Sequence, residues 1–280
     1  EKYKYYIRIG TMDASLQGRS IADIAKDIFL LKGLKKTAIL GVEDAFARFV
    51  LGSAKKHMIK DGFEVVHEYY FARTEDDYGK ILNDALGKNP DFLSIVLLAE
   101  KETHAFIKKI NELSINKKMP IIGSIAELIT DNYKKGNNLV EGFATLQPNG
   151  GPVDLTGEGG ALKFTEAYSK RYGESPYWLC YTVYDTLKIL KSAIEKSGSF
   201  SANKIIQVFE ADDFEYIGSA RYKWKKENHD LIVGEHNGKL YSTFVWFQFS
   251  SDRKRYAVYP LRFRQKDYWI PSRENRNYQR

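Results

Sequence analysis

Short apolar runs alternate with amphipathic segments through the first half of the chain. Residues 36–41 (KTAILG) and 91–99 (DFLSIVLLA) are apolar almost throughout, and each run has the length of a buried strand. Between them lies a segment whose apolar residues recur at near-helical spacing and which ends at Gly62; these residues are Phe46, Phe49, Val50, Ala54 and Met58. Strands that are apolar on both sides and alternate with such helices are typical of a parallel sheet covered on both faces. The pattern predicts an α/β protein.

The same criteria place the remaining elements along the chain. We expect further strands at residues 5–9, 63–71, 119–123 and 139–145, and further helices at residues 18–31, 77–86, 103–113, 160–172, 177–197 and 201–209. Residues 149–160 (NGGPVDLTGEGG) are rich in glycine and turn-forming residues, which indicates a loop crossing between two lobes. The last part changes character, because residues 222–224, 241–249 and 256–259 are aromatic and alternating and predict strands or a hairpin.

Charge is unevenly distributed along the 280 residues. The net charge is +7, yet residues 251–280 alone hold nine basic and three acidic side chains. The first 250 residues are therefore nearly neutral, which argues against a nucleic-acid-binding surface. For the basic segment two interpretations stay open: a solvated tail, or a contact with an acidic partner or an anionic membrane surface.

The cysteine count and the lengths of the apolar runs exclude disulfide-rich, zinc-cysteine and membrane-spanning classes of protein. The single cysteine, Cys180, rules out an internal disulfide framework and a cysteine-based zinc site. No apolar run reaches the roughly 18–20 residues of a membrane-spanning helix. The first residues (EKYKYY) lack the layout of a signal peptide, which a mature exported protein would have lost in any case.

Catalytic motifs are not found. The turn after the run at residues 36–41 is GVEDAF, whose acidic pair would repel a phosphate group. No G-x-S-x-G motif occurs, and the surroundings of His229 and His236 favour a solvated loop over a metal site. We therefore expect no catalytic residues, no metal ligands and no cofactor.

The carboxyl ends of the predicted strands are the places where open α/β sheets bind small ligands. Here these ends are residues 11–17, 43–46, 98–102 and 124–127. They either converge on one small-molecule crevice or form ordinary strand-to-helix turns, and the pattern alone leaves both open.

Several stretches, in order, resemble one known family. These are residues 13–18 (DASLQG), 35–40 (KKTAIL), 89–91 (NPD), 164–168 (FTEAY), 172–176 (YGESP) and 194–198 (IEKSG). Their order and spacing resemble the type I periplasmic solute-binding proteins, the branched-chain amino-acid, urea and amide receptors of ABC importers. The resemblance covers about residues 5–260. It implies that the family's first hundred-odd residues have no counterpart in this chain.

The resemblance implies a two-lobed fold that closes on a ligand, with parallel sheets covered by helices on both faces and the first lobe incomplete in this chain. It implies that residues 1–19 form a hinge and first-lobe segment, residues 20–145 the second lobe and residues 146–250 the return to the first lobe. Residues 251–280 then form a basic C-terminal segment.

The resemblance also implies ligand-binding positions in the cleft between the lobes. Asp13 matches an acidic residue of the family, Phe46 stands where amino-acid receptors place a tyrosine, and Ala99 lies near a second tyrosine position. Ile125 stands where those receptors carry the glutamate that pairs with a ligand ammonium, and an isoleucine cannot stabilise a buried charge. Two further residues of the strand-end loops, Gln17 and Glu43, complete the candidate set.

The function implied is that of a non-enzymatic periplasmic or cell-surface protein. It would hand a small molecule, aromatic or amide-like and not a free α-amino acid, to the membrane permease of an ABC importer. An alternative with the same fold is the ligand-sensing domain of a receptor or regulator. A third alternative is an α/β enzyme that depends on Glu43 or Asp44.

Overall fold

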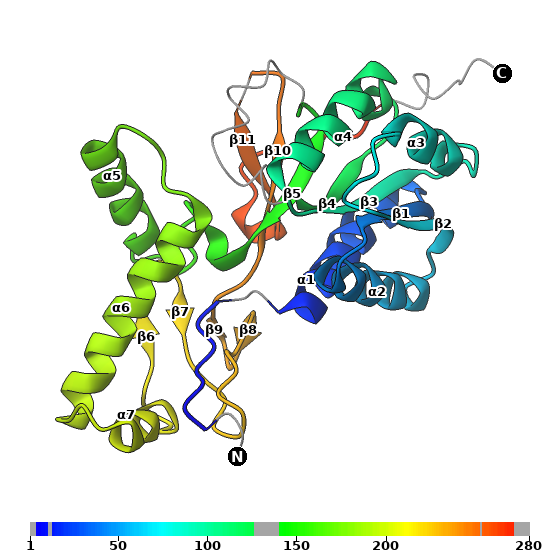
Figure 1. Cartoon of the computed structure of the whole chain (residues 1–280). Coiled ribbons are helices and arrows are strands. Elements are labelled where there is room, and N and C mark those ends of the chain that lie inside the picture. Colours follow the sequence, from blue (N-terminus) through cyan, green and yellow to red (C-terminus); the bar gives the residue numbers. More distant parts are fainter. Residues whose placement is uncertain (1–3, 11–12, 126–139, 253, 272–280) are drawn as a thin grey trace. The chain divides into compact units, whose positions relative to one another are not determined.

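A computed structural model of the chain describes residues 4–10, 13–125, 140–252 and 254–271. The chain divides into two compact units (Figure 1). Unit 1 comprises Glu1–Thr11 and Gln147–Val245, and unit 2 comprises Met12–Leu146 and Trp246–Arg280.

A seven-stranded sheet forms the centre of unit 2, in the order β11-β10-β5-β4-β3-β1-β2. Its strands are β1 (Lys36–Val42), β2 (Glu64–Phe71), β3 (Phe92–Leu97), β4 (Ile121–Ile125), β5 (Phe143–Gln147), β10 (Val245–Phe249) and β11 (Arg255–Tyr259). Strands β1 to β5 pair in parallel, whereas β10 and β11 pair antiparallel. The expected α/β fold with a parallel sheet is confirmed, and two antiparallel strands extend it.

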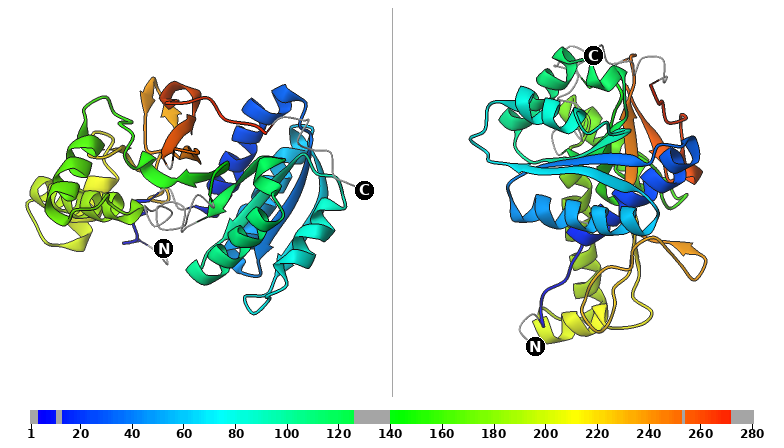
Figure 2. Two further views of the ribbon diagram at one scale, coloured as in Figure 1. Left: turned by 90° about the horizontal axis from the view of Figure 1, so that it is seen from above. Right: turned by 90° about the vertical axis from the view of Figure 1, so that its right-hand side faces the viewer.

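Helices cover both faces of this sheet (Figures 1 and 2). Helices α1 (Ala14–Ile24) and α2 (Ala45–Lys60) lie on one face, and α3 (Tyr78–Leu86) and α4 (Glu100–Glu112) lie on the other. Every residue of β3 and of β4 is consequently buried. The hydroxyl groups of Thr37 and Ser94 inside the sheet lie 3.1 Å apart and satisfy each other by a hydrogen bond.

Two predicted features of the helices of unit 2 differ from the structure. The helix expected at residues 18–31 begins at Ala14, because the Asp13 carboxylate caps it by accepting from the Leu16 amide at 2.9 Å. It continues through a π turn, Ala25–Phe29, and a 3₁₀ turn, Leu30–Lys32. Phe49, counted with the apolar face of α2, is 71% exposed, because it lies off the buried stripe formed by Ala47, Val50, Leu51, Ala54 and Met58.

Among its described residues, unit 1 contains three α-helices and two short hairpins. These are α5 (Gly160–Tyr172), α6 (Trp178–Ser197) and α7 (Ala202–Phe209), with β6 (Tyr216–Ile217) paired to β7 (Arg221–Tyr222) and β8 (Glu235–His236) paired to β9 (Lys239–Leu240). The helices match the sequence prediction to within one residue at each end. The hairpin of β8 and β9 was not foreseen, since its strands have only two residues each.

The strand expected at residues 5–9 does not form. Arg8 instead makes isolated contacts within unit 1: its amide donates to the His229 carbonyl at 3.3 Å, and its carbonyl accepts from Trp224 Nε1 at 2.8 Å. Its side chain also donates to the Asp230 carboxylate at 2.9 Å. Single contacts of this kind hold an extended segment in place without a ladder of strand hydrogen bonds.

Part of the basic segment 251–280 belongs to the sheet, because β11 pairs with β10. The strand predicted at residues 256–259 is thereby confirmed, while residues 272–280 lie outside the described part. Among the described helices, none combines the length and the apolar character that crossing a membrane requires.

Candidate functional site

The carboxyl ends of three neighbouring strands bring most of the candidate residues to one edge of unit 2. Strands β4, β3 and β1 are adjacent in the sheet and parallel. Ile125 ends β4, Ala99 follows β3 and Glu43 follows β1. Since loops at this edge are where open α/β sheets hold ligands, we call it the carboxyl edge and treat it as the candidate site.

Helix α1 and its N-cap contribute two further candidates of this unit, and α2 contributes the last one, Phe46. Asp13 serves as the N-cap of α1, so that its carboxylate is engaged with the helix backbone. Gln17 is fully buried, and its side-chain oxygen accepts from the Ser124 hydroxyl of β4 at 3.1 Å. Gln17 thus joins α1 to the end of β4 and orients Ser124.

Glu43 is directed toward α2. Its carboxylate accepts from the Arg48 guanidinium at 2.5 Å, and this hydrogen bond holds the pKa of Glu43 below its usual range. Arg48 also lies over the Tyr70 ring of β2, 4.3 Å from its centroid. Glu43 is therefore already neutralised by a cation of its own unit.

Phe46 and Ala99 are held through their backbone amides. The Phe46 amide donates to the Asp44 carboxylate, the N-cap of α2, at 2.8 Å, and the Phe46 side chain is half-buried. The Ala99 amide and its neighbour Leu98 donate to one oxygen of the Glu102 carboxylate at 3.0 and 2.8 Å. Both positions are fixed by carboxylates that cap helix starts.

Ile125 is completely buried at the end of β4, and its amide donates to the Thr145 hydroxyl of β5 at 3.2 Å. The side chain at this position is therefore apolar and carries no charge. The Thr145 hydroxyl also donates to the Ile125 carbonyl, and the neighbouring Ser124 side chain is buried.

Sequence reasoning missed two residues of this edge. Arg73 follows β2 and lies between the carboxylates of Asp44 and Glu102, at 3.2 and 3.8 Å. In the sequence, the one indication of a role for Arg73 is its position two residues after the strand predicted at residues 63–71. The buried hydroxyl of Thr103, in the first turn of α4, has no hydrogen-bond partner within the described residues.

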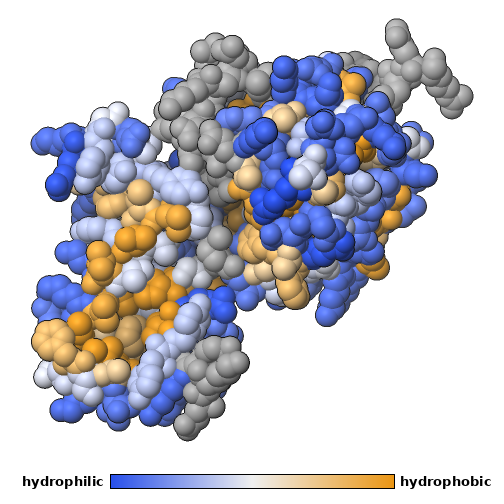
Figure 3. All heavy atoms as spheres, viewed as in Figure 1, coloured by the Kyte–Doolittle hydropathy of each residue, from blue (hydrophilic) through white to orange (hydrophobic). Residues whose placement is uncertain are grey.

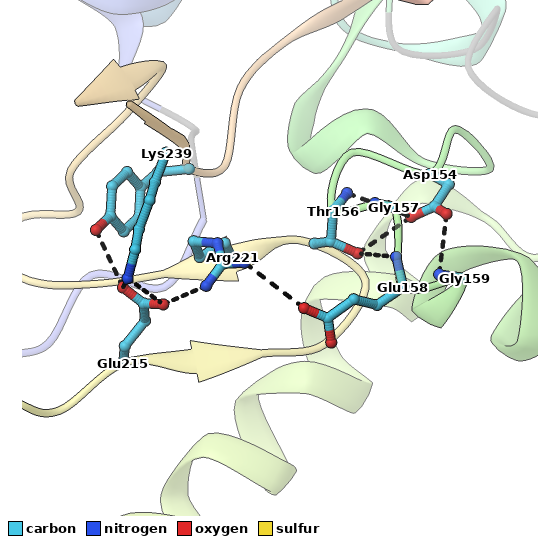
Figure 4. Close-up of polar contacts among 9 residues, drawn as sticks. Asp154, Thr156, Gly157, Glu158, Gly159, Glu215, Arg221 and Lys239 are labelled. Carbon is cyan, nitrogen blue, oxygen red and sulfur yellow. Dashed lines mark hydrogen bonds and ion pairs between the residues drawn. The ribbon is translucent and has the colours of Figure 1, made fainter. Parts of the chain in front are cut away.

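A separate polar cluster lies in unit 1 (Figure 4). The Asp154 carboxylate accepts from the amides of Thr156, Gly157 and Gly159 at 2.9–3.2 Å, and so shapes the glycine-rich turn before α5. Arg221 lies between Glu158, at 3.6 Å, and Glu215, which also accepts from Tyr241 and Lys239. The ion pairs of Arg221 join the glycine-rich turn to the β6–β7 hairpin. The two cations, Arg221 and Lys239, balance the two carboxylates of Glu158 and Glu215.

Metal chemistry finds no support in the part of the chain that the structure describes. No group of three or more His, Cys, Asp or Glu side chains is placed there to hold an ion. The Nε2 atom of His229 lies 3.1 Å from Glu210 Oε1, so this imidazole is hydrogen-bonded to a carboxylate of the same unit.

Comparison with known families identifies the class of protein. A family model described as periplasmic binding protein matches residues 2–237. The chain therefore belongs to the periplasmic binding protein family, as its sequence pattern predicts. A search of curated proteins found no match.

Solved structures of the same fold agree with this family. An ABC transporter substrate-binding protein from Sphaerobacter thermophilus matches with a TM-score of 0.74 at 14% identity, over 91% of this chain and 66% of that chain. A leucine-binding protein from Thermotoga maritima matches with a TM-score of 0.71 at 22% identity, over 91% and 67%. A solute-binding protein from R. palustris in complex with benzoate matches with a TM-score of 0.69 at 15% identity, over 86% and 62%. The chain thus spans about two thirds of these structures.

Proposed function

We propose that this chain is the larger part of an extracytoplasmic solute-binding protein that captures a small molecule at the carboxyl edge of unit 2 and delivers it to the permease of an ABC importer. The observation that carries the proposal is the family match over residues 2–237. The carboxyl edge supports it, because helix starts, buried hydroxyls and one half-buried aromatic ring lie there.

The ligand we propose is not a free α-amino acid. A ligand ammonium needs a carboxylate that is not already engaged by other groups of the protein. At the carboxyl edge, Glu43 is paired with Arg48, and Asp44 and Glu102 each hold a loop backbone with one oxygen and contact Arg73 with the other. Ile125 places an apolar side chain at the end of β4, which supports a ligand without a positive charge.

An aromatic or amide-like ligand fits the groups that remain. The half-buried Phe46 ring at the start of α2 offers a face for stacking. Two solved relatives in fold bind molecules of this kind: the R. palustris protein is in complex with benzoate, and one from Rhodopseudomonas palustris BisB5 is in complex with 3,4-dihydroxybenzoic acid. These ligands are arylcarboxylates and carry no ammonium.

Unit 1 is, in this proposal, part of a first lobe whose remainder lies outside the 280 residues. Residues 1–19 and 146–250 would contribute to that lobe, residues 20–145 would form the second lobe, and residues 251–280 would form the C-terminal segment.

The exposed surface of unit 1 supports this assignment (Figure 3). Helix α6 buries Tyr181 and Ile189 on one side, yet its other side exposes Val183 by 55% and Leu187 by 64%. The exposed side borders an apolar groove of about 860 Å³ between α5 and α6. A helix that is apolar on two sides is typical of a layer packed between two others.

Calorimetric titration of the full-length protein tests the ligand proposal. Benzoate is expected to release or absorb heat with a saturable isotherm, and leucine is expected to give none. Tight binding of leucine or another free amino acid would refute the proposal. The matched variant is Phe46→Ala, which removes the stacking face and is expected to weaken benzoate binding about tenfold, in line with the contribution of one aromatic contact.

A further inference from the structure

Three consecutive loops at the carboxyl edge meet at one side chain, that of Arg73. The loops follow β2, β1 and β3, which are neighbours in the sheet. Arg73 comes from the loop after β2, Asp44 from the loop after β1, and Glu102 from the first turn of α4, after β3. Arg73 therefore reaches across the middle loop to the third one.

Glu102 is the deeper of the two acidic partners, since its side chain is only 5% exposed. One of its oxygens accepts the amides of Leu98 and Ala99, and the other lies 3.8 Å from Arg73 Nη1. A carboxylate removed from water in this way is costly unless a cation neutralises it. Within the described residues, Arg73 is the cation that lies within ion-pair distance of Glu102.

Asp44 is arranged in the same way. One of its oxygens accepts the Phe46 amide at 2.8 Å, and the other accepts from Arg73 Nη2 at 3.2 Å. Each carboxylate thus uses one oxygen to hold a loop backbone and the other to contact the same guanidinium.

We propose that Arg73 is a positioning residue that fixes the loop carrying Phe46 and the loop carrying Ala99 relative to each other. Its two nitrogens contact the two carboxylates that hold those backbones. The inference rests on the proposed function, because the spacing of these loops matters for ligand affinity only if the carboxyl edge binds a ligand.

The chemistry of the guanidinium suits this task. Its nitrogens are held in a rigid plane and point in different directions, so that one group can contact two carboxylates at once. A lysine ammonium at the same position is a single point charge on a flexible stem. Lysine keeps the charge and is expected to restore only part of the coupling.

Amide hydrogen exchange without any ligand tests the coupling directly. In Arg73→Gln, the amides of Leu98, Ala99 and Phe46 are expected to exchange about fivefold faster, the effect of losing roughly 1 kcal/mol of ion pairing. Arg73→Lys is expected to lie between this variant and the parent. The matched control is Lys55→Gln, which removes the Lys55–Glu68 ion pair between α2 and β2 and should leave these amides unchanged.

A double-mutant cycle separates positioning from general stabilisation. Arg73→Gln and Glu102→Gln are expected to be non-additive in the exchange of the Ala99 amide, because each removes the same contact. Unchanged exchange in Arg73→Gln, or full additivity of the two variants, would overturn the proposal.

Benzoate affinity provides the functional arm. Arg73→Gln is expected to bind benzoate about fivefold more weakly, whereas Lys55→Gln should bind benzoate as the parent does. Faster exchange with unchanged affinity would overturn the positioning role. If the parent protein binds no benzoate, the proposed ligand class fails, and the exchange result still decides whether Arg73 couples the loops.

Discussion

Asp44 shows how one residue serves both the local fold and the candidate site. It caps α2, holds the backbone of Phe46 and contacts Arg73. The Phe46 amide is the largest influence that lowers the pKa of Asp44 below its ordinary value of 3.8, and Arg73 adds to it. The stabilisation from the charged form is therefore complete above pH 3.8 and is lost as the pH falls through the lowered native pKa.

Replacing this cap is expected to destabilise the protein in a pH-dependent way. Asp44→Ala should lower the free energy of unfolding by about 1 kcal/mol at pH 7, as is usual for a lost N-cap. The deficit should shrink in strongly acidic solution, where the parent carboxylate is protonated. Denaturant unfolding at pH 7 and in strongly acidic solution measures this loss of unfolding free energy. Asp44→Asn is the control, because asparagine keeps most of the cap. An equal loss of unfolding free energy at the two pH values would contradict a stabilising role of the charged Asp44 carboxylate.

At the residue scale, the sequence located the candidate edge better than it assigned roles there. The strand-end loops contain Glu102 and Ser124 as well as the named candidates. The pairing of side chains was out of reach, because it depends on which loops become neighbours. Arg73 and Asp44 are separated by 29 positions and meet only because β1 and β2 are adjacent. The ligand-binding roles of the six candidates stay predictions.

At the element scale, long periodic segments were predicted well and short ones poorly. Helices α5, α6 and α7 and strand β1 lie where the pattern placed them, since each buries a clear apolar set. The segment at residues 5–9 forms no strand, because no neighbouring strand pairs with it within the described residues. Nothing in the pattern distinguishes a strand from an extended segment held by isolated contacts.

Gly123 is the element-scale feature on which the candidate site depends most. A Cβ at this position of β4 would lie 1.7 Å from the Ile95 carbonyl oxygen of β3. Only glycine therefore allows β4 to approach β3 and to present Ser124 and Ile125 at the carboxyl edge.

Gly123→Ala is expected to lower the free energy of unfolding by about 3 kcal/mol or more, because a backbone atom blocks the added methyl group. The matched control is Gly52→Ala in α2, where nothing lies within 4 Å of the added atom. That variant should gain about 0.5–1 kcal/mol from helix propensity. Thermal or denaturant unfolding compares the two, and a neutral Gly123→Ala would show that the strands need no such close approach.

At the scale of the whole molecule, the exposed apolar side of α6 is the feature that the 280 residues leave unexplained. The solved structures that match the fold are longer by about a third of their length. We attribute the exposed side to packing against that additional part of a first lobe.

Charge introduced on this side is expected to destabilise the full-length protein. The double variant Val183→Lys/Leu187→Lys should lower the melting temperature by about 4 °C or more, because it places two charges in a packed layer. Phe49→Lys on α2, where the native side chain is 71% exposed, is the control and should change it little. An unchanged melting temperature in the double variant would mean that the surface is free in the complete protein.

The central claim is that the protein carries a small solute without a free ammonium group. Native mass spectrometry of the full-length protein, purified from its source without denaturation, tests this most directly. We predict a bound small molecule that is released on unfolding and identified as an aromatic or amide-like compound. A released leucine or other free amino acid would contradict the claim.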